Sequence, residues 1–262
     1  MRTAWSLLVW VLCFLVLIVL GTPFLILSLF DNGGARVYPI SVQYMRSVAA
    51  LVGLKIEAGG MEKVPAGTTY IVMANHRSWW DIPAIMLGSW PMQLRFVAKK
   101  ELADMPLFGL CVRQGGHVLI DRNDRDSAIR SMREGARRFA GRFSIVVFPE
   151  GTRSPDHRLL RFKRGGFHLS RELNIPIVPV SIVGGERIMR KGSINLYPGT
   201  MRVRFGAPIL PGDYPDMDSL VTVVRERIGE GLAGMGEFLA DGAAGATVAD
   251  PGVAGASGDR MA

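Results

Sequence analysis

The longest hydrophobic run of the chain lies at its amino end. Residues 5–30 contain no charged side chain, and about 20 apolar residues suffice for a helix that crosses a bilayer. A secretory signal would have a shorter apolar region of about 7–15 residues and a cleavage site of small residues. We therefore predict that residues 1–30 form a membrane anchor. Because Gly21-Thr22-Pro23 interrupts the run and proline kinks helices, one kinked spanning helix and two shorter helices in one leaflet both fit the pattern.

The next segment, residues 31–64, is amphipathic. The spacing of apolar residues between Tyr38 and Val52 predicts a helix, and Arg36, Arg46 and Lys55 accompany it. Such a helix either lies at the membrane surface with its basic side chains toward lipid headgroups, or packs on the domain that follows. In the first arrangement, residues 31–64 form an interfacial segment.

From residue 65 onward, short β-rich runs alternate with helical segments. Apolar, β-branched runs typical of buried strands occupy residues 68–75, 94–99, 117–120, 144–148, 175–183 and 200–206. Helical segments occupy residues 82–90, 101–114, 124–140, 166–173 and 217–239. This alternation predicts an α/β domain over residues 65–240, with a mixed, largely parallel sheet flanked by helices. The Ala/Gly-rich residues 241–262 are typical of a disordered tail.

The charge of the chain narrows its possible partners. The net charge is +8, and a basic surface attracts nucleic acid, anionic lipid or phosphorylated substrates. Beside an apolar anchor, an anionic membrane surface is the simplest partner. The basic residues gather at strand ends behind this anchor, so we expect no nucleic acid to bind. Two cysteines and four histidines without clustering predict neither a disulfide framework nor a metal site.

A histidine and an aspartate follow the first predicted strand of the domain. His76 and Asp81 are five positions apart, which on a continuous helix would place them about 140° from each other. They can meet only if His76 lies in the turn and Asp81 in the first helical turn. A carboxylate on one ring nitrogen would then raise the basicity of the other, as a general base requires. The alternative is a capped turn, with Asn75 or Ser78 as the cap and His76 merely exposed.

A second polar segment leaves the predicted strand at 144–148. In Pro149-Glu150-Gly151-Thr152-Arg153, glycine allows a close backbone approach, while threonine and arginine offer a hydroxyl and a bidentate fork for phosphate. Residues 142–171 contain seven Lys or Arg against two acids, a local charge of +5. Because α/β folds bind ligands at the carboxyl ends of strands, we predict an anion site here, although a solvated face would show the same charges. Lys99 ends another predicted strand, and Arg122 lies just beyond a third.

Taken together and in order, these motifs resemble the glycerolipid acyltransferase family, and within it the bacterial 1-acylglycerol-3-phosphate acyltransferases. The resemblance covers about residues 65–210 and rests on NHRSWWD (75–81), KKEL (99–102), PLFG (106–109), GGHVLIDR (115–122), FPEGTRS (148–154) and IPIVPV (175–180). Any one of these motifs is weak evidence of kinship. Several motifs in the same order and with similar spacing are highly specific.

The resemblance implies a role for each of these positions. His76 would deprotonate the free hydroxyl of a lysophospholipid, and Asp81 would orient it. The alkoxide would attack the donor thioester directly, which agrees with the lack of a G-x-S-x-G nucleophile motif. Lys99 matches a position that helps to stabilise the oxyanion. The positions matching the acceptor-binding motifs are Arg122, Glu150, Gly151, Thr152 and Arg153, and Pro179 matches the fourth motif.

The implied reaction transfers a fatty acyl group from acyl-CoA or acyl carrier protein to the sn-2 hydroxyl of lysophosphatidic acid, giving phosphatidic acid without a bound cofactor. Another lysolipid acceptor, such as a lyso-ornithine lipid, and a non-catalytic lipid-binding role remain as alternatives. Arg36, Arg46 and Lys55 after the anchor outnumber Arg2 before it, which predicts a catalytic domain on the cytoplasmic side of the inner membrane. Trp79 and Trp80 fit either the acyl entrance or the core.

Overall fold

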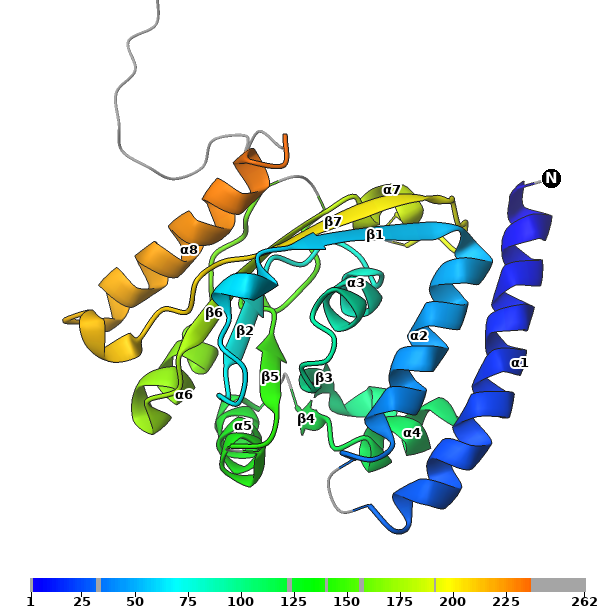
Figure 1. Cartoon of the computed structure of the whole chain (residues 1–262), viewed down its shortest axis with the longest axis horizontal. Helices are drawn as coiled ribbons and strands as arrows, with labels where there is room; N and C mark the ends of the chain where they lie inside the picture. The colour runs from blue at the N-terminus through cyan, green and yellow to red at the C-terminus, as the bar shows by residue number, and fades with distance from the viewer. Residues whose placement is uncertain are drawn as a thin grey trace, which may run out of the picture.

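The described residues form one mixed sheet of seven strands at the centre of the molecule (Figure 1). The computed structural model describes residues 2–31, 34–121, 124–139, 141–155, 158–190 and 192–236. The strands are β1 (Leu54–Gly59), β2 (Ile71–Ala74), β3 (Leu94–Lys99), β4 (Val118–Ile120), β5 (Ser144–Val147), β6 (Ile177–Val183) and β7 (Gly199–Phe205). Their order is β1-β7-β6-β2-β5-β3-β4. The strands from β6 to β4 in this order are parallel, and β7 is antiparallel to β6, so the predicted mixed, largely parallel sheet is confirmed.

Helices cover both faces of the sheet. On one face, α1 (Arg2–Ser28), α2 (Tyr38–Val52) and α3 (Asp81–Gly88) share a hydrophobic core with Val72 of β2, and α4 (Phe108–Gln114) packs against α1. On the other face, α5 (Arg125–Phe139), α6 (Gly165–Leu173) and α8 (Met217–Ala233) share a second core with Ile71. Successive β2 side chains enter opposite cores because side chains alternate along a strand. The short elements are α7 (Gly185–Ile188), η1 (Met61–Lys63), η2 (Lys100–Asp104) and η3 (Pro211–Asp213).

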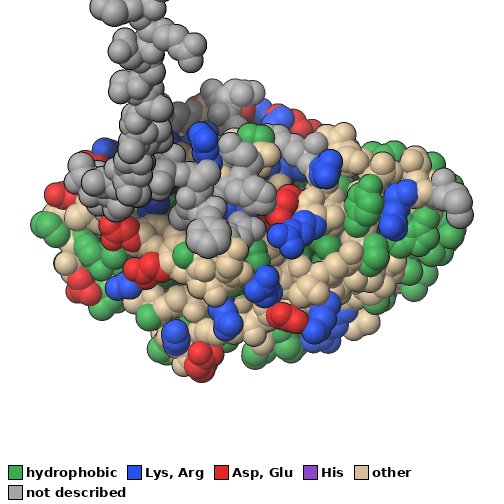
Figure 2. Space-filling model, turned by 90° about the horizontal axis from the view of Figure 1, so that it is seen from above, with side chains coloured by type: hydrophobic (Ala, Val, Ile, Leu, Met, Phe, Trp, Pro, Cys, Tyr) green, Lys and Arg blue, Asp and Glu red, His purple; other side chains and the backbone are tan. Residues whose placement is uncertain are grey.

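The amino-terminal helix α1 lies along the domain. It continues through Pro23 as one helix, which decides against two separate helices. Trp10 Nε1 donates to the Ile194 carbonyl at 2.9 Å, and Ser6 Oγ accepts the Leu196 amide at 2.9 Å. The opposite side of α1 is exposed and apolar, and Figure 2 shows hydrophobic side chains gathered at the end of the molecule where α1 lies. Within the described residues, α1 is the one helix long and apolar enough to cross a membrane.

One face of the predicted amphipathic helix in residues 31–64 packs on the domain. The helix Tyr38–Val52 forms as predicted, and it buries Val42 and Val52 in the core beside α1 and α3. The segment also supplies β1, an edge strand that pairs with β7. This strand was not predicted because the charges of Lys55 and Glu57 interrupt its short apolar pattern. The predicted tail, residues 241–262, lies outside the described residues.

Candidate active site

His76 and Asp81 meet at the carboxyl end of β2. His76 lies in the turn after the strand, and Asp81 is the first residue of α3. His76 Nδ1 is 2.8 Å from Asp81 Oδ2. The same oxygen accepts the backbone amides of Arg77 at 2.7 Å and Ser78 at 2.9 Å. The Asp81 carboxylate therefore stabilises the turn between β2 and α3 and also orients the imidazole ring. Both contacts depend on the separation of five positions between His76 and Asp81.

Asp81 is enclosed, whereas His76 reaches the surface. The Asp81 residue is 1% exposed and the His76 side chain 14% exposed. Because a carboxylate is an acceptor only, Nδ1 donates the proton in this hydrogen bond, and in the neutral ring the lone pair is then on Nε2. Gly185, after β6, makes the enclosure possible, because a Cβ there would lie 2.7 Å from Asp81 Oδ1. No local pattern indicates this glycine, because it is 104 residues away from Asp81.

The segment FPEGTRS (148–154) contacts His76 at three points. The Phe148 ring stacks on the imidazole with 4.0 Å between centroids. Glu150 Oε1 accepts the His76 amide at 2.8 Å, and the Ser154 amide donates to the His76 carbonyl at 2.8 Å. Burial raises the pKa of Glu150, although hydrogen bonds from the amides of Leu160 and His76 act to lower it. Sequence reasoning missed the roles of Phe148 and Ser154.

Of the remaining residues of this segment, Pro149 is buried, and Gly151, Thr152 and Arg153 are half-buried or exposed. Gly151 adopts a left-handed φ of 71°, and the Lys163 side chain crosses it so closely that a Cβ at 151 would lie 2.7 Å from Lys163 Cε. Thr152 is exposed. The Arg153 guanidinium carbon lies 5.0 Å from the centre of the Trp79 ring, which is a cation–π geometry. Trp79 is 46% exposed and accompanies this arginine, whereas Trp80 is 3% exposed and belongs to the core.

Two predicted site residues lie elsewhere or outside the described chain. Lys99 ends β3, and its Nζ is 3.0 Å from Glu101 Oε1. Because β5 separates β2 from β3, two strand spacings of about 4.8 Å place the strand ends that carry His76 and Lys99 about 10 Å apart. Arg122 lies outside the described residues, and the neighbouring Asp121 binds Lys100.

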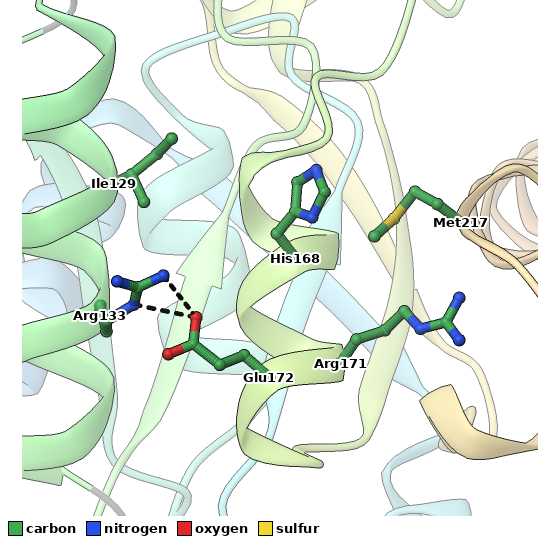
Figure 3. A pocket seen from close by; sticks show the side chains of 6 residues that line it. All are labelled: Ile129, Arg133, His168, Arg171, Glu172 and Met217. Atoms are coloured by element: carbon green, nitrogen blue, oxygen red, sulfur yellow. Dashed lines mark hydrogen bonds and ion pairs between the residues drawn. The ribbon is translucent and has the colours of Figure 1, made fainter.

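The described residues enclose hollows away from the His76–Asp81 pair, of which two are notable. One, of about 620 Å³, opens between α5, α6 and the start of α8, where Glu172 binds Arg133 at 2.7 Å (Figure 3). The other, of about 90 Å³, is an apolar cavity bounded by α1, α2, α3 and α4 and by His117. Its lining comes from segments far apart in the chain, so the sequence could not indicate it. The described residues contain no group of three or more His, Cys, Asp or Glu that could hold a metal ion.

Comparison with known proteins identifies the family. The model of the family described as Acyltransferase matches residues 55–183. The human 1-acyl-sn-glycerol-3-phosphate acyltransferase alpha is 32% identical over 200 residues, which are 72% of this chain and 70% of that protein. The chain belongs to the acyltransferase family. The resemblance found in the sequence motifs is thereby confirmed.

Other acyltransferases show how much of the chain is shared. The 1-acyl-sn-glycerol-3-phosphate acyltransferase of Limnanthes alba is 38% identical over 67% of this chain. The chain spans 63% of that protein and 49% of the Cocos nucifera enzyme of the same name, less than two thirds of either. The crystal structure of the 1-acyl-sn-glycerophosphate (LPA) acyltransferase PlsC from Thermotoga maritima has the same fold. It superposes with a TM-score of 0.77 over 92% of this chain and 98% of PlsC, at 24% identity.

Proposed function

We propose that this acyltransferase transfers a fatty acyl group from acyl-CoA or acyl carrier protein to the sn-2 hydroxyl of lysophosphatidic acid, forming phosphatidic acid. The observation that carries the proposal is the 2.8 Å contact between His76 Nδ1 and Asp81 Oδ2, because it leaves Nε2 as a base at the surface. The names of the relatives support the acceptor, since the human and Limnanthes alba proteins are both 1-acyl-sn-glycerol-3-phosphate acyltransferases.

In this reaction His76 acts as the general base. Nε2 removes the proton of the acceptor hydroxyl as its oxygen forms a bond to the thioester carbonyl carbon. The tetrahedral intermediate then breaks its C–S bond, and the leaving thiolate takes the proton back from Nε2. Asp81 holds the ring in the required tautomer and stabilises the imidazolium that forms in between. Such general-base catalysis contributes about 10²–10⁴ in rate.

Cations at the strand ends would recognise the acceptor phosphate. Arg153 holds its guanidinium against Trp79 at the carboxyl end of β5, where it offers a planar fork to phosphate oxygens. Thr152 precedes it in the chain and offers an exposed hydroxyl, whereas the Gly151 amide already donates to the Phe148 carbonyl at 3.0 Å. Arg122 stays a candidate on its sequence motif alone. Lys99 would stabilise the oxyanion after a movement of its side chain away from Glu101.

The exposed side of α1 would hold the enzyme at the membrane. Near its start α1 bonds to Ile194 and Leu196, and Gly21 near its end lies against Cys111. Because the domain accompanies the helix along its length, we propose that α1 lies in one leaflet instead of crossing the bilayer. The cytoplasmic face of the inner membrane fits the basic residues after the anchor and the cytosolic location of both thioester donors.

An acyl-transfer assay tests the function. Membranes containing the wild type, His76→Ala or His168→Ala would receive labelled palmitoyl-CoA or palmitoyl-acyl carrier protein, with lysophosphatidic acid or lyso-ornithine lipid as acceptor. We expect phosphatidic acid from the wild type and from His168→Ala, whose altered histidine is exposed on α6, and no product from His76→Ala.

Each other outcome has a clear meaning. Full activity of His76→Ala contradicts the mechanism. Product from lyso-ornithine lipid alone contradicts the acceptor and leaves the mechanism standing. A wild type that binds lysolipid without transferring an acyl group to either acceptor is a non-catalytic lipid-binding protein.

A further inference from the structure

We propose that Glu150 is a positioning residue that fixes the backbone of His76, and that it does not bind the acceptor. This inference rests on the proposed function, because it concerns the base of that reaction. It separates FPEGTRS (148–154) into two parts. Phe148, Glu150 and Ser154 hold the base, whereas Arg153 and its neighbours face the acceptor.

Both carboxylate oxygens of Glu150 are already used by the protein. Oε1 accepts the His76 amide at 2.8 Å, and Oε2 accepts the Leu160 amide at 3.0 Å. The residue is 3% exposed. A lysophospholipid headgroup would have to displace a backbone amide to reach either oxygen, and a buried amide without a partner is costly. The geometry therefore favours an internal role.

The sheet places Glu150 directly beside His76. In the parallel pair β2–β5, Ile71 is opposite Ile145 and Met73 is opposite Val147, a constant offset of 74 residues. The same offset takes His76 to Glu150. The carboxylate thus continues the ladder beyond the last paired residues, at the point where β2 turns toward α3. It replaces a backbone carbonyl as the acceptor for the His76 amide.

Three contacts from one segment then define the position of the base. Glu150 holds the His76 amide, the Ser154 amide holds its carbonyl, and the Phe148 ring stacks on the imidazole at an interplanar angle of 20°. Asp81 adds the bond to Nδ1. With both backbone groups, one ring face and one ring nitrogen held, the direction of Nε2 is fixed before any substrate binds.

The surroundings of Glu150 suit a carboxyl group that accepts two backbone amides. Burial raises its pKa, while the hydrogen bonds from the Leu160 and His76 amides act in the opposite direction and favour the ionised form. A glutamine has the same shape without the charge. Its amide group, however, has one oxygen and one NH₂ group, so it cannot accept both the His76 and the Leu160 amides through separate oxygens.

Kinetics with Glu150→Gln test the inference. A misplacement of about 1 Å costs about 10²-fold in rate, so we expect kcat to fall about 10²-fold with an unchanged KM for lysophosphatidic acid. Phe148→Leu, which removes the stacked ring, should also lower kcat alone. Arg153→Gln is the matched comparison and should raise KM. A Glu150→Gln variant with raised KM and unchanged kcat would show acceptor binding and overturn the proposal.

A second measurement does not depend on activity. In protein labelled with ¹⁵N-histidine, the ring signals of His76 should shift in Glu150→Gln, while those of His117, which binds the Phe96 amide, should not. Unchanged His76 signals would overturn the inference. If the wild type transfers no acyl group, the proposed function fails, and these spectra still decide whether Glu150 positions His76.

Discussion

Replacing Asp81 by asparagine isolates the charge of the carboxylate. One oxygen, Oδ2, accepts His76 Nδ1 and the amides of Arg77 and Ser78. An asparagine whose amide oxygen occupies this position keeps all three hydrogen bonds, loses the negative charge and places an NH₂ group at the Oδ1 position. The turn should therefore persist, and the variant measures what the charge contributes to the reaction.

The size of that contribution follows from the distance. With 2.8 Å between Nδ1 and Oδ2, the centres of the imidazolium and carboxylate charges lie about 4 Å apart, where attraction at an effective dielectric constant of about 20 amounts to about 4 kcal/mol. This attraction arises only when His76 has taken the proton. At about 1.4 kcal/mol for each tenfold change, Asp81→Asn should lower kcat about 10³-fold.

The assay is labelled acyl transfer to lysophosphatidic acid at saturating donor, with thermal unfolding as the control. Because the three hydrogen bonds remain, we expect a loss of stability below about 1 kcal/mol, or about 2–4 °C in Tm. A variant that unfolds normally and keeps kcat within about tenfold of the wild type, or about 1.4 kcal/mol, would refute the assignment of Asp81 as the partner of a catalytic imidazolium.

Gly185, His117 and α1 each offer a separate test. Gly185→Ala places a Cβ 2.7 Å from Asp81 Oδ1 and should reduce transfer about 10²-fold, whereas Gly212→Ala, where a Cβ meets nothing within 4 Å, should not. Burial lowers the pKa of His117 from 6.5 to about 3. Between about pH 6.5 and pH 3, the His117 ring is protonated in the unfolded chain and neutral in the folded chain. The free energy of unfolding should therefore fall as the pH is lowered from about 6.5 toward 3. Thermal unfolding would show this slope, and His117→Gln should flatten it. Leu15→Asp on α1 should cost about 2.5–3.5 kcal/mol in lipid and weaken vesicle flotation, while the equally exposed Leu210→Asp should float like the wild type.

The hydrophobic pattern of the sequence predicted helices and strands well where its periodicity was clear. The helix Tyr38–Val52 and the strand Leu94–Lys99 have the predicted bounds. The meeting of His76 with Asp81 was also predictable, because both residues lie on one strand–turn–helix unit and only one arrangement of that unit brings them together.

Features that depend on strand order were beyond local reasoning. Glu150 reaches His76 because β5 lies beside β2 with an offset of 74 residues, and no spacing within either motif encodes that neighbour. Gly185, the first residue of α7, reaches Asp81 for the same reason. The strand β1 was missed because an edge strand tolerates charges such as Lys55 and Glu57, which blur the alternation that marks a strand.

Ser6 and Trp10 of α1 form hydrogen bonds with the loop before β7. If α1 lies in the leaflet as proposed, these bonds would set the distance between the lipid and the sheet that carries His76. A lysolipid acceptor would then have to rise from the leaflet by that distance to reach the base. The membrane thickness and the headgroup size that the enzyme tolerates would then be properties of the packing of α1, adjustable without any change near the base.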